Sequence, residues 1–269
     1  MLDWNPALYL RFASERTRPA AELLARVPLD PAQVRHVVDL GCGPGNSTEL
    51  LAQRFVHAQV LGVDNSPAML ATARQQLPQV RFELDDIATW APQAGTPAPD
   101  LMDLIFANAS LQWVSAHEVL IPRLLSLLAP GGVLAIQMPD NHQQPSHRLM
   151  REIAQLPQFA SHIGQVERVR TEILPIGTYY DLLAAPGAQS AAVDVWHTIY
   201  QHPMASPAAI VQWLRSTGLK PFVEGLPAGL QTDFVQAYEH RVDAAYPARA
   251  DGQRLLAFPR LFLVAQRSA

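Results

Sequence analysis

Acidic side chains and glycines follow successive apolar segments of this sequence, in an order that suits a nucleoside ligand. The first segment contains Asp39 and breaks into Gly41, Gly43 and Gly45, and the second segment ends at Asp64. Glycines let backbone N–H groups approach a ligand closely, and a carboxylate at the end of the next strand can accept hydrogen bonds from both ribose hydroxyls. The residue types and their spacing therefore predict a nucleoside-binding site at the ends of adjacent strands.

The spacing of the glycines indicates which kind of nucleoside is bound. A dinucleotide-binding turn reads G-x-G-x-x-G, whereas the third glycine here comes one residue early and Asn46 takes the final glycine position. The run from Val37 to Gly45 instead resembles the first motif of the class I S-adenosylmethionine-dependent methyltransferases. That resemblance implies a cationic nucleoside cofactor, for which Asp39 would supply a negative charge. A tight strand-to-helix corner without a ligand is the alternative that the turn alone leaves open.

Residues after the second, third and fourth strands extend the predicted cofactor site. Asp64 is expected to accept from the ribose, although an acid at this position would also favour the positive end of the next helix. Asp86 is preferred to Asp85 as acceptor for the adenine amine, and Ile87 would cover the ring; a shift of one residue would exchange the two acids. The full predicted set of cofactor-binding residues is Asp39, Gly41, Gly43, Asp64, Asn65, Met69, Asp86, Ile87, Asn108, Ala109 and Trp113.

Short apolar runs alternate with helical patterns between residues 36 and 138, as in βαβ units. Ser66-Pro67 and Asn46-Ser47-Thr48 signal helix starts, and Gly131-Gly132 signals a helix end. We expect strands at residues 36–41, 59–63, 80–84, 101–107, 132–138, 193–202 and 258–265, and downstream helices at 145–156, 207–217 and 229–245. The sequence therefore predicts an α/β fold with a doubly wound, mostly parallel, seven-stranded Rossmann-like methyltransferase sheet and a helical lid.

Changes in the alternation of strand and helix patterns suggest how the chain is divided into segments. Residues 1–30 are expected to form an N-terminal helical lid segment and residues 31–140 the S-adenosylmethionine-binding core. Residues 141–257 are expected to form a helical substrate lid that contains one core strand at about 193–202, and residues 258–269 the final core strand.

Composition excludes several classes of protein. Of the 269 residues, 49% are hydrophobic and 16% charged, and no run approaches the apolar length of about 18 residues that a membrane span needs. The net charge of −4, without a basic block, argues against a nucleic-acid partner. Because Cys42 is the single cysteine and the N-terminal residues lack the pattern of a secretory signal, we expect a cytoplasmic protein. Cys42 is interpreted as a small apolar side chain rather than a nucleophile.

Segments spread over the chain carry a narrower resemblance within the class I superfamily. They are similar to the methyltransferases that act on trans-aconitate, and they comprise residues 3–12, 15–20, 106–113, 137–141 and 256–262. The resemblance implies methyl transfer from S-adenosylmethionine to one carboxylate of this tricarboxylate, giving a monomethyl ester and S-adenosylhomocysteine. Residues 157–192 match least.

A reaction of this kind needs no proton-abstracting residue. A carboxylic acid with a pKa of about 4 is already ionised at neutral pH, so its oxygen is ready to attack. The protein has to hold that oxygen in line with the methyl group and exclude water. We therefore predict a positioning mechanism with no catalytic side chain.

Binding a tricarboxylate requires cations or several hydrogen-bond donors. Arg11 and Arg18 are seven residues apart and would share a helix face, whereas Arg16 is rotated away; Arg16 or Glu15 could reverse this assignment. The predicted substrate-binding residues are Tyr9, Arg11, Arg18 and, as weaker candidates, His142 and Arg260. No metal site is expected, because the histidines after Asp140 lack the spacing of a ligand pair.

Two other functions stay open at this point. The chain could methylate another small carboxylic acid or a carrier-bound acyl group, because a Rossmann-like core does not identify the acceptor. It could also be a protein that binds S-adenosylmethionine without catalysis. The sequence does not indicate an oligomeric state.

Overall fold

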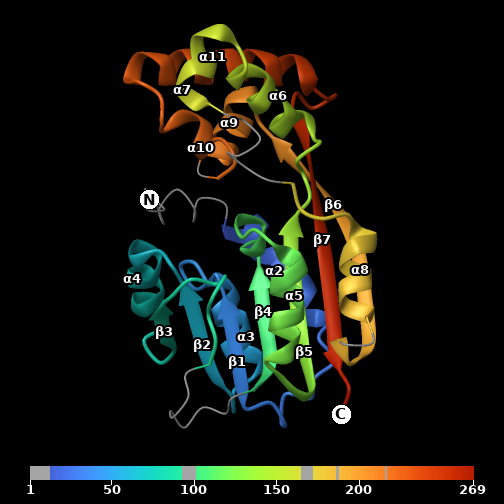
Figure 1. Ribbon diagram of the computed structural model, residues 1–269. Coiled ribbons are helices and arrows are strands. Elements are labelled where there is room, and N and C mark those ends of the chain that lie inside the picture. The colour runs from blue at the N-terminus through green and yellow to red at the C-terminus, as the bar shows by residue number, and fades with distance from the viewer. Residues whose placement is uncertain (1–12, 93–100, 165–171, 186–187, 216) are drawn as a thin grey trace. The chain divides into compact units, whose positions relative to one another are not determined.

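A seven-stranded sheet organises the chain. The computed structural model describes residues 13–92, 101–164, 172–185, 188–215 and 217–269 (Figure 1). The strands lie in the order β3-β2-β1-β4-β5-β7-β6. The pairs formed by β3, β2, β1, β4 and β5 are parallel, whereas β7 runs in the opposite direction (Figure 1). The bounds are β1 (His36–Leu40), β2 (Gln59–Asp64), β3 (Arg81–Leu84), β4 (Met102–Asn108), β5 (Leu128–Pro139), β6 (Ser190–Met204) and β7 (Arg254–Arg267).

The predicted α/β fold with a mostly parallel seven-stranded sheet is confirmed, and a strand is present at each predicted place. The start of β5 differs from the prediction. Leu128 already pairs with Met102, and the ladder resumes only at Val133 opposite Leu104. Gly131, predicted to end a helix, has φ +77° within this irregular part of β5. Such a bulge depends on the partner strand, so the apolar pattern of the segment cannot reveal it.

The described chain separates into two compact units. The first contains the described residues up to Met138 together with 173–197 and 261–269, and the second contains 139–172 and 198–260. Helices of the first unit are α2 (Ala13–Ala25), α3 (Asn46–Arg54), α4 (Pro67–Gln76), the 3₁₀ turn η1 (Leu111–Trp113), α5 (His117–Ser126) and α8 (Ile176–Ala184). Helices of the second unit are α6 (Pro145–Ala154), α7 (Pro157–Ile163), α9 (Pro207–Arg215), α10 (Lys220–Val223) and α11 (Ala228–Ala245). Within the described ranges, none of the helices has the length and apolar composition to cross a membrane.

Each unit has its own apolar core. In the first unit, Ile105 of β4 and Ile121 of α5 are fully buried in a cluster that also takes in residues of α8 and β7. In the second unit, α11 packs against α6 and α9. Its Phe234 ring lies 5.1 Å from Phe159 and 6.4 Å from Phe222, measured between ring centroids. Aromatic contacts of this kind add to the free energy gained by burial.

The two predicted helix starts have different capping arrangements in the structure. At α4, Ser66 caps the helix as predicted, because its hydroxyl accepts a hydrogen bond from Met69 N at 3.2 Å and Pro67 is the first helical residue. At α3, the cap position is Gly45, and no described side chain caps the helix. The helix begins at Asn46, so the run marks the predicted helix start, but its residues form the first turn and do not precede the helix. The hydroxyls of Ser47 and Thr48 serve a different purpose, described below.

Candidate active site

The glycine turn lies where β1 ends, against the ends of β2 and β4. Gly41 N donates to the Val63 carbonyl oxygen at 2.7 Å. Gly41 has φ +74°, and a Cβ atom there would lie only 2.2 Å from the Cβ of Ser110. Gly43 has φ +55°, but no atom of the described chain lies within 4 Å of its ideal Cβ position. Gly41 is therefore required by close packing, whereas no described atom packs against the Cβ position of Gly43.

Cys42, between these glycines, is buried. Burial raises the pKa of its thiol well above the ordinary value, and the carboxylates of Asp39 and Asp64 raise it further. A thiol that resists ionisation is a poor nucleophile. This agrees with the predicted role of Cys42 as a small apolar side chain.

Asp64 connects the end of β2 to the glycine turn. Its Oδ2 accepts from Gly43 N at 2.8 Å, and its Oδ1 accepts from Ser66 N at 2.9 Å at the start of α4. Each carboxylate oxygen can accept more than one hydrogen bond, so these contacts orient Asp64 and leave it able to accept hydrogen bonds from a ligand. The structure thus brings Asp64 and Gly43 together, as the spacing predicted.

Asp39 is fully buried beside the first turn of α3. Its Oδ2 accepts from Ser47 Oγ at 2.7 Å and from Thr48 Oγ1 at 2.6 Å. Its Oδ1 has no hydrogen-bond partner among the described residues. Burial raises the pKa of Asp39 from 3.8 to about 6, although the two hydroxyl hydrogen bonds lower it. Asp39 therefore anchors a helix that lacks a side-chain cap, a role that the sequence analysis did not predict; its predicted contact with a cofactor stays a prediction.

The segment after β3 reaches the same turn. Asp85 N donates to Asp64 O at 3.2 Å, which places the ends of β2 and β3 together. Asp86 is exposed, and its Oδ1 accepts from Ala88 N at 2.9 Å. The Cδ1 atom of Ile87 lies 3.0 Å from the ideal Cβ position of Gly41. Ile87 thus contacts the glycine turn, and Asp86 precedes it in an exposed loop.

The loop after β4 supplies buried acceptors. Asn108, predicted to meet the amino-acid part of the cofactor, ends β4, and its buried Oδ1 has no hydrogen-bond partner among the described residues. Ala109 adopts φ +54°, and its carbonyl accepts from Gln112 Nε2 at 2.6 Å. Gln112 Oε1 is also buried without a described partner. Trp113, the predicted wall, is 40% exposed. Buried acceptors of this kind are expected to meet donors on a ligand or ordered water.

The remaining predicted cofactor residues begin α4. Met69 is buried at the first turn of the helix, and Asn65 is exposed just before it. Both follow Asp64 directly along the chain, so the structure places them beside the end of β2.

A buried hydrogen-bond chain, missed by the sequence analysis, holds the loop after β4. His117 Nε2 lies 2.9 Å from the Leu111 carbonyl oxygen, so it carries the proton, and its Nδ1 accepts from the Tyr179 hydroxyl at 2.5 Å. The same hydroxyl accepts from Leu174 N at 3.3 Å. These hydrogen bonds connect α8 to η1. His117 and Tyr179 are 62 residues apart, so no local pattern could have indicated the contact.

The predicted N-terminal substrate residues are only partly covered by the structure. Tyr9 and Arg11 lie outside the described residues. Arg18 lies on α2, where its Nε is 2.7 Å from Glu22 Oε1 and 67% of its side chain is exposed. The shared helix face proposed for Arg11 and Arg18 therefore stays a prediction.

Two predicted substrate residues lie in the second unit. His142 is half-buried, with Nδ1 3.7 Å from Glu172 Oε2. Arg260 is only 4% exposed. The Cζ atom of Arg260 lies 4.9 Å from the Phe258 ring centroid and 5.8 Å from that of Tyr200. Arg260 is thus a buried cation among aromatic rings.

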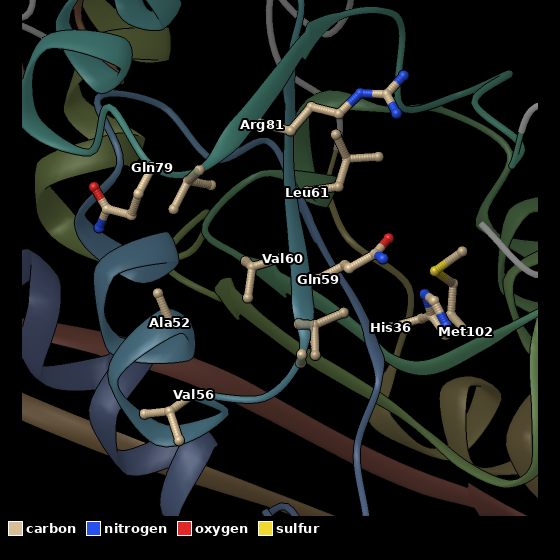
Figure 2. A pocket seen from close by; sticks show the side chains of 12 residues that line it. His36, Ala52, Val56, Gln59, Val60, Leu61, Gln79, Arg81 and Met102 are labelled. Atoms are coloured by element: carbon tan, nitrogen blue, oxygen red, sulfur yellow. The ribbon is translucent and has the colours of Figure 1, made fainter. Parts of the chain in front are cut away.

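A hollow of about 500 Å³ lies at the other end of the sheet. His36, Gln59 and Arg81, which begin β1, β2 and β3, line it (Figure 2). The amino ends of parallel strands are opposite to the glycine turn, so this hollow is separate from the candidate site. Within the described ranges, no group of His, Cys, Asp and Glu side chains could hold a metal ion.

Known proteins are similar to this chain in sequence and in fold. A family model described as a methyltransferase domain matches residues 37–132. A trans-aconitate 2-methyltransferase from Delftia acidovorans is 72% identical over 271 residues, which cover 99% of each chain. Another from Yersinia pestis is 52% identical and covers 98% of each chain.

Solved structures with similar folds are more distant in sequence. The YcgJ protein from Bacillus subtilis has a TM-score of 0.58 at 15% identity, covering 94% of this chain and 99% of its own. A phosphoethanolamine N-methyltransferase from Haemonchus contortus has a TM-score of 0.53 at 17% identity, covering 94% of this chain and 53% of its own. At these identities the likeness shows the fold alone.

Gly41→Ala should be far more destabilising than Gly43→Ala. The new methyl group at position 41 would lie 2.2 Å from Ser110 Cβ, whereas a methyl group at position 43 would meet no described atom within 4 Å. We expect Gly41→Ala to lower the free energy of unfolding by about 2–4 kcal/mol, from left-handed strain and overpacking together, and Gly43→Ala by about 1 kcal/mol. Urea denaturation measures both. Equal losses would contradict the packing role of Gly41.

Asp39→Asn should flatten the dependence of stability on pH in the ligand-free protein. Burial raises the pKa of Asp39 to about 6 in the folded protein, against an ordinary value of 3.8. The unfolded chain therefore releases this proton first, and the free energy of unfolding falls as the pH rises between about 4 and 6, by about 3 kcal/mol in all. Asparagine does not titrate. Urea denaturation from acid to neutral pH should show the variant gaining stability relative to the original protein, and a constant difference would refute the shift.

Proposed function

The chain belongs to the trans-aconitate 2-methyltransferase family, and we propose that it transfers the methyl group of S-adenosylmethionine to one carboxylate oxygen of trans-aconitate. The products are a monomethyl ester and S-adenosylhomocysteine. The observation that carries this function is the high identity to curated relatives over nearly the full length of both chains. The strand-end acids and the glycine turn of the first unit agree with it.

The residues of the candidate site fit this cofactor. The space beside Gly43 leaves room for a ligand against the backbone. The buried oxygens of Asn108 and Gln112, which lack described partners, suit donors such as an ammonium group. Asp64, oriented by two backbone N–H groups, suits the ribose hydroxyls. Together these groups match the hydroxyls, the amine and the ammonium of S-adenosylmethionine.

We assign the individual contacts as follows. Asp64 would accept from the ribose, Asp86 from the adenine amine, and Ile87 would cover the adenine ring. Asn108 would meet the amino-acid part. The other members of the proposed cofactor site are Asp39, Gly41, Gly43, Asn65, Met69, Ala109 and Trp113.

The reaction requires positioning rather than proton transfer. When bound, S-adenosylmethionine supplies a methyl group on a positively charged sulfur. The acceptor carboxylate, with a pKa of about 4, needs no base to ionise it. The residues of this chain therefore act by holding the acceptor and by keeping water away from the attacking oxygen. We assign no general acid or base.

Acceptor binding is assigned to cationic and polar side chains. Arg260 is the best supported, because a buried guanidinium can hold a carboxylate through two hydrogen bonds. Tyr9, Arg11, Arg18 and His142 are proposed as further contacts. Arg18 would have to exchange its partner Glu22 for the substrate.

We also propose that the enzyme works in the cytoplasm on a small molecule and not on nucleic acid. The free, buried thiol of Cys42 suits a reducing compartment. The net charge of −4 disfavours binding to phosphate backbones.

Incubation with S-adenosylmethionine and trans-aconitate should yield a monomethyl ester detectable by mass spectrometry. Parallel reactions with cis-aconitate, citrate and isocitrate should give less product, because family membership predicts the trans isomer as acceptor. If only a carrier-bound acid is methylated, trans-aconitate is not the acceptor. Binding of S-adenosylmethionine without turnover of any acid would favour a non-catalytic binding protein.

Asp64→Asn should weaken S-adenosylmethionine binding by about 10- to 100-fold, because it removes the charge from two hydrogen bonds to the cofactor. The KM for trans-aconitate should change little. Titration calorimetry and steady-state kinetics measure the two effects. Asp181→Asn, at an exposed position on α8, is the matched control and should leave cofactor affinity unchanged. Unaltered affinity in Asp64→Asn would mean that this acid only holds the glycine turn and the start of α4 in place.

A further inference from the structure

One guanidinium holds the turn that follows β3. Arg123, in the last turn of α5, donates from Nη1 to Trp90 O at 2.5 Å. Its Nη2 donates to Ala88 O at 2.9 Å and to Ile87 O at 3.1 Å. The three carbonyls belong to one short stretch of chain directly after Asp86, and all of these residues lie in the first unit. A single side chain of α5 therefore satisfies three backbone acceptors of the same turn.

Hydrogen bonds inside the turn use its N–H groups. Asp86 O accepts from Thr89 N at 3.1 Å and from Trp90 N at 2.8 Å, and Asp86 Oδ1 accepts from Ala88 N at 2.9 Å. Carbonyls at the end of such a turn have no N–H partner of their own, and a guanidinium with five donors suits them. The side chains of Asp86, Ala88 and Thr89 are exposed, so their burial contributes little to fixing the turn.

The groups that hold the turn are themselves anchored in the core. The Trp90 side chain is 2% exposed and belongs to the same buried cluster as Ile121 and Leu124 of α5. Arg123 lies between those two residues in the helix and is half-buried, and burial lowers the pKa of its guanidinium. An arginine keeps its charge at neutral pH all the same. Side chains fixed on a packed helix hold a contact more precisely than a loop does by itself.

The turn held by Arg123 carries the residues assigned to adenine. Asp86 is proposed to accept from the adenine amine and Ile87 to cover the ring, and Ile87 Cδ1 lies 3.0 Å from the ideal Cβ position of Gly41. A carboxylate accepts from an amine, whereas the carbonyl oxygen of hypoxanthine offers it only a second acceptor. That mismatch weakens binding fully only if the carboxylate cannot move away. The rigidity of the turn therefore controls how strongly the site distinguishes the two bases.

We infer that Arg123 is a positioning residue for adenine, which acts through the turn at residues 87–90 and sets the preference of the site for adenine over hypoxanthine. The inference rests on the proposed function, because that function supplies the adenine-containing cofactor. It adds to the site a residue that holds the binding turn and is not itself assigned a contact with the ligand.

Arg54 offers a matched control in the same unit. Its guanidinium also donates to three backbone carbonyls, those of Leu24, Val27 at 2.8 Å and Leu29 at 3.3 Å. It too is half-buried, and burial lowers its pKa. The segment that it holds lies between α2 and β1, which carries none of the residues assigned to adenine. The two arginines thus make the same kind of contact at different places.

Arg123→Gln should weaken the binding of S-adenosylhomocysteine by about 10-fold, because the turn loses its three external donors. Binding of S-inosylhomocysteine, in which hypoxanthine replaces adenine, should change little, so the preference for adenine falls by about 10-fold. Arg54→Gln should lose a similar amount of stability and keep the preference. Arg123→Lys, which retains a cation with three donors, should recover part of it. Calorimetric titration with both nucleosides measures the preference, and urea denaturation measures the stability.

Hydrogen exchange in the ligand-free protein gives a second readout, which needs no cofactor. Arg123→Gln should speed exchange of the amide hydrogens of Thr89 and Trp90 by about 10-fold, because their turn opens more often. Arg54→Gln should leave both amides unchanged. A folded Arg123→Gln variant with unaltered exchange, or with an unaltered preference for adenine, would overturn the inference. So would an equal loss of preference in Arg54→Gln. If Arg123→Gln does not fold, an unaltered preference in Arg123→Lys would overturn it.

Failure of this inference is distinguishable from failure of the proposed function. If the original protein binds S-adenosylhomocysteine but does not methylate trans-aconitate, the proposed acceptor is wrong, and the comparison of the Arg123 and Arg54 variants still decides the inference. If the original protein binds neither nucleoside, the proposed cofactor is wrong and the inference falls with it. Methylation by the original protein, together with an unaltered adenine preference in Arg123→Gln, would overturn the inference alone.

Discussion

The close approach of Gly41 to Ser110 is the constraint on which the candidate cofactor site depends. The hydroxyl of Ser110 donates to Leu40 O at 2.6 Å, and Gly41 N donates to Val63 O at 2.7 Å. These two hydrogen bonds join the ends of β1, β2 and β4 around a residue that has no room for a side chain. Because Asp64 and Ile87 reach the same turn, the groups assigned to the cofactor share one location.

Asp39, next to this turn in β1, is fully buried, and burial disfavours its charged form. Asp39 accepts two hydroxyl hydrogen bonds, and yet desolvation outweighs them and raises its pKa to about 6. The carboxylate secures the first turn of α3 through Ser47 and Thr48, where Gly45 offers no side chain as a cap. A cationic cofactor would favour the ionised form of Asp39. The same acid thus combines a structural contact with a charge that suits the proposed methyl donor.

The two units present different kinds of side chains. The first presents backbone groups, carboxylates and buried amide oxygens, which are suited to a ligand rich in hydrogen-bond donors. The second places the basic side chains of His147, His202 and Arg260 among aromatic rings. Arg260 is the centre of that second arrangement, and its contacts with Phe258 and Tyr200 make it more than an isolated surface cation.

By itself the sequence determined the sheet, the order of glycines and acids at the strand ends, and the kind of cofactor, because apolar periodicity and local spacing express those features directly. It did not reveal the bulge near Gly131, the anchoring role of Asp39, or the contact between His117 and Tyr179. Nor did it indicate that His147 and His202 lie against the ring next to Arg260. These contacts join residues from separate elements, and their partners are chosen by how the chain packs. Only the tertiary structure could decide them.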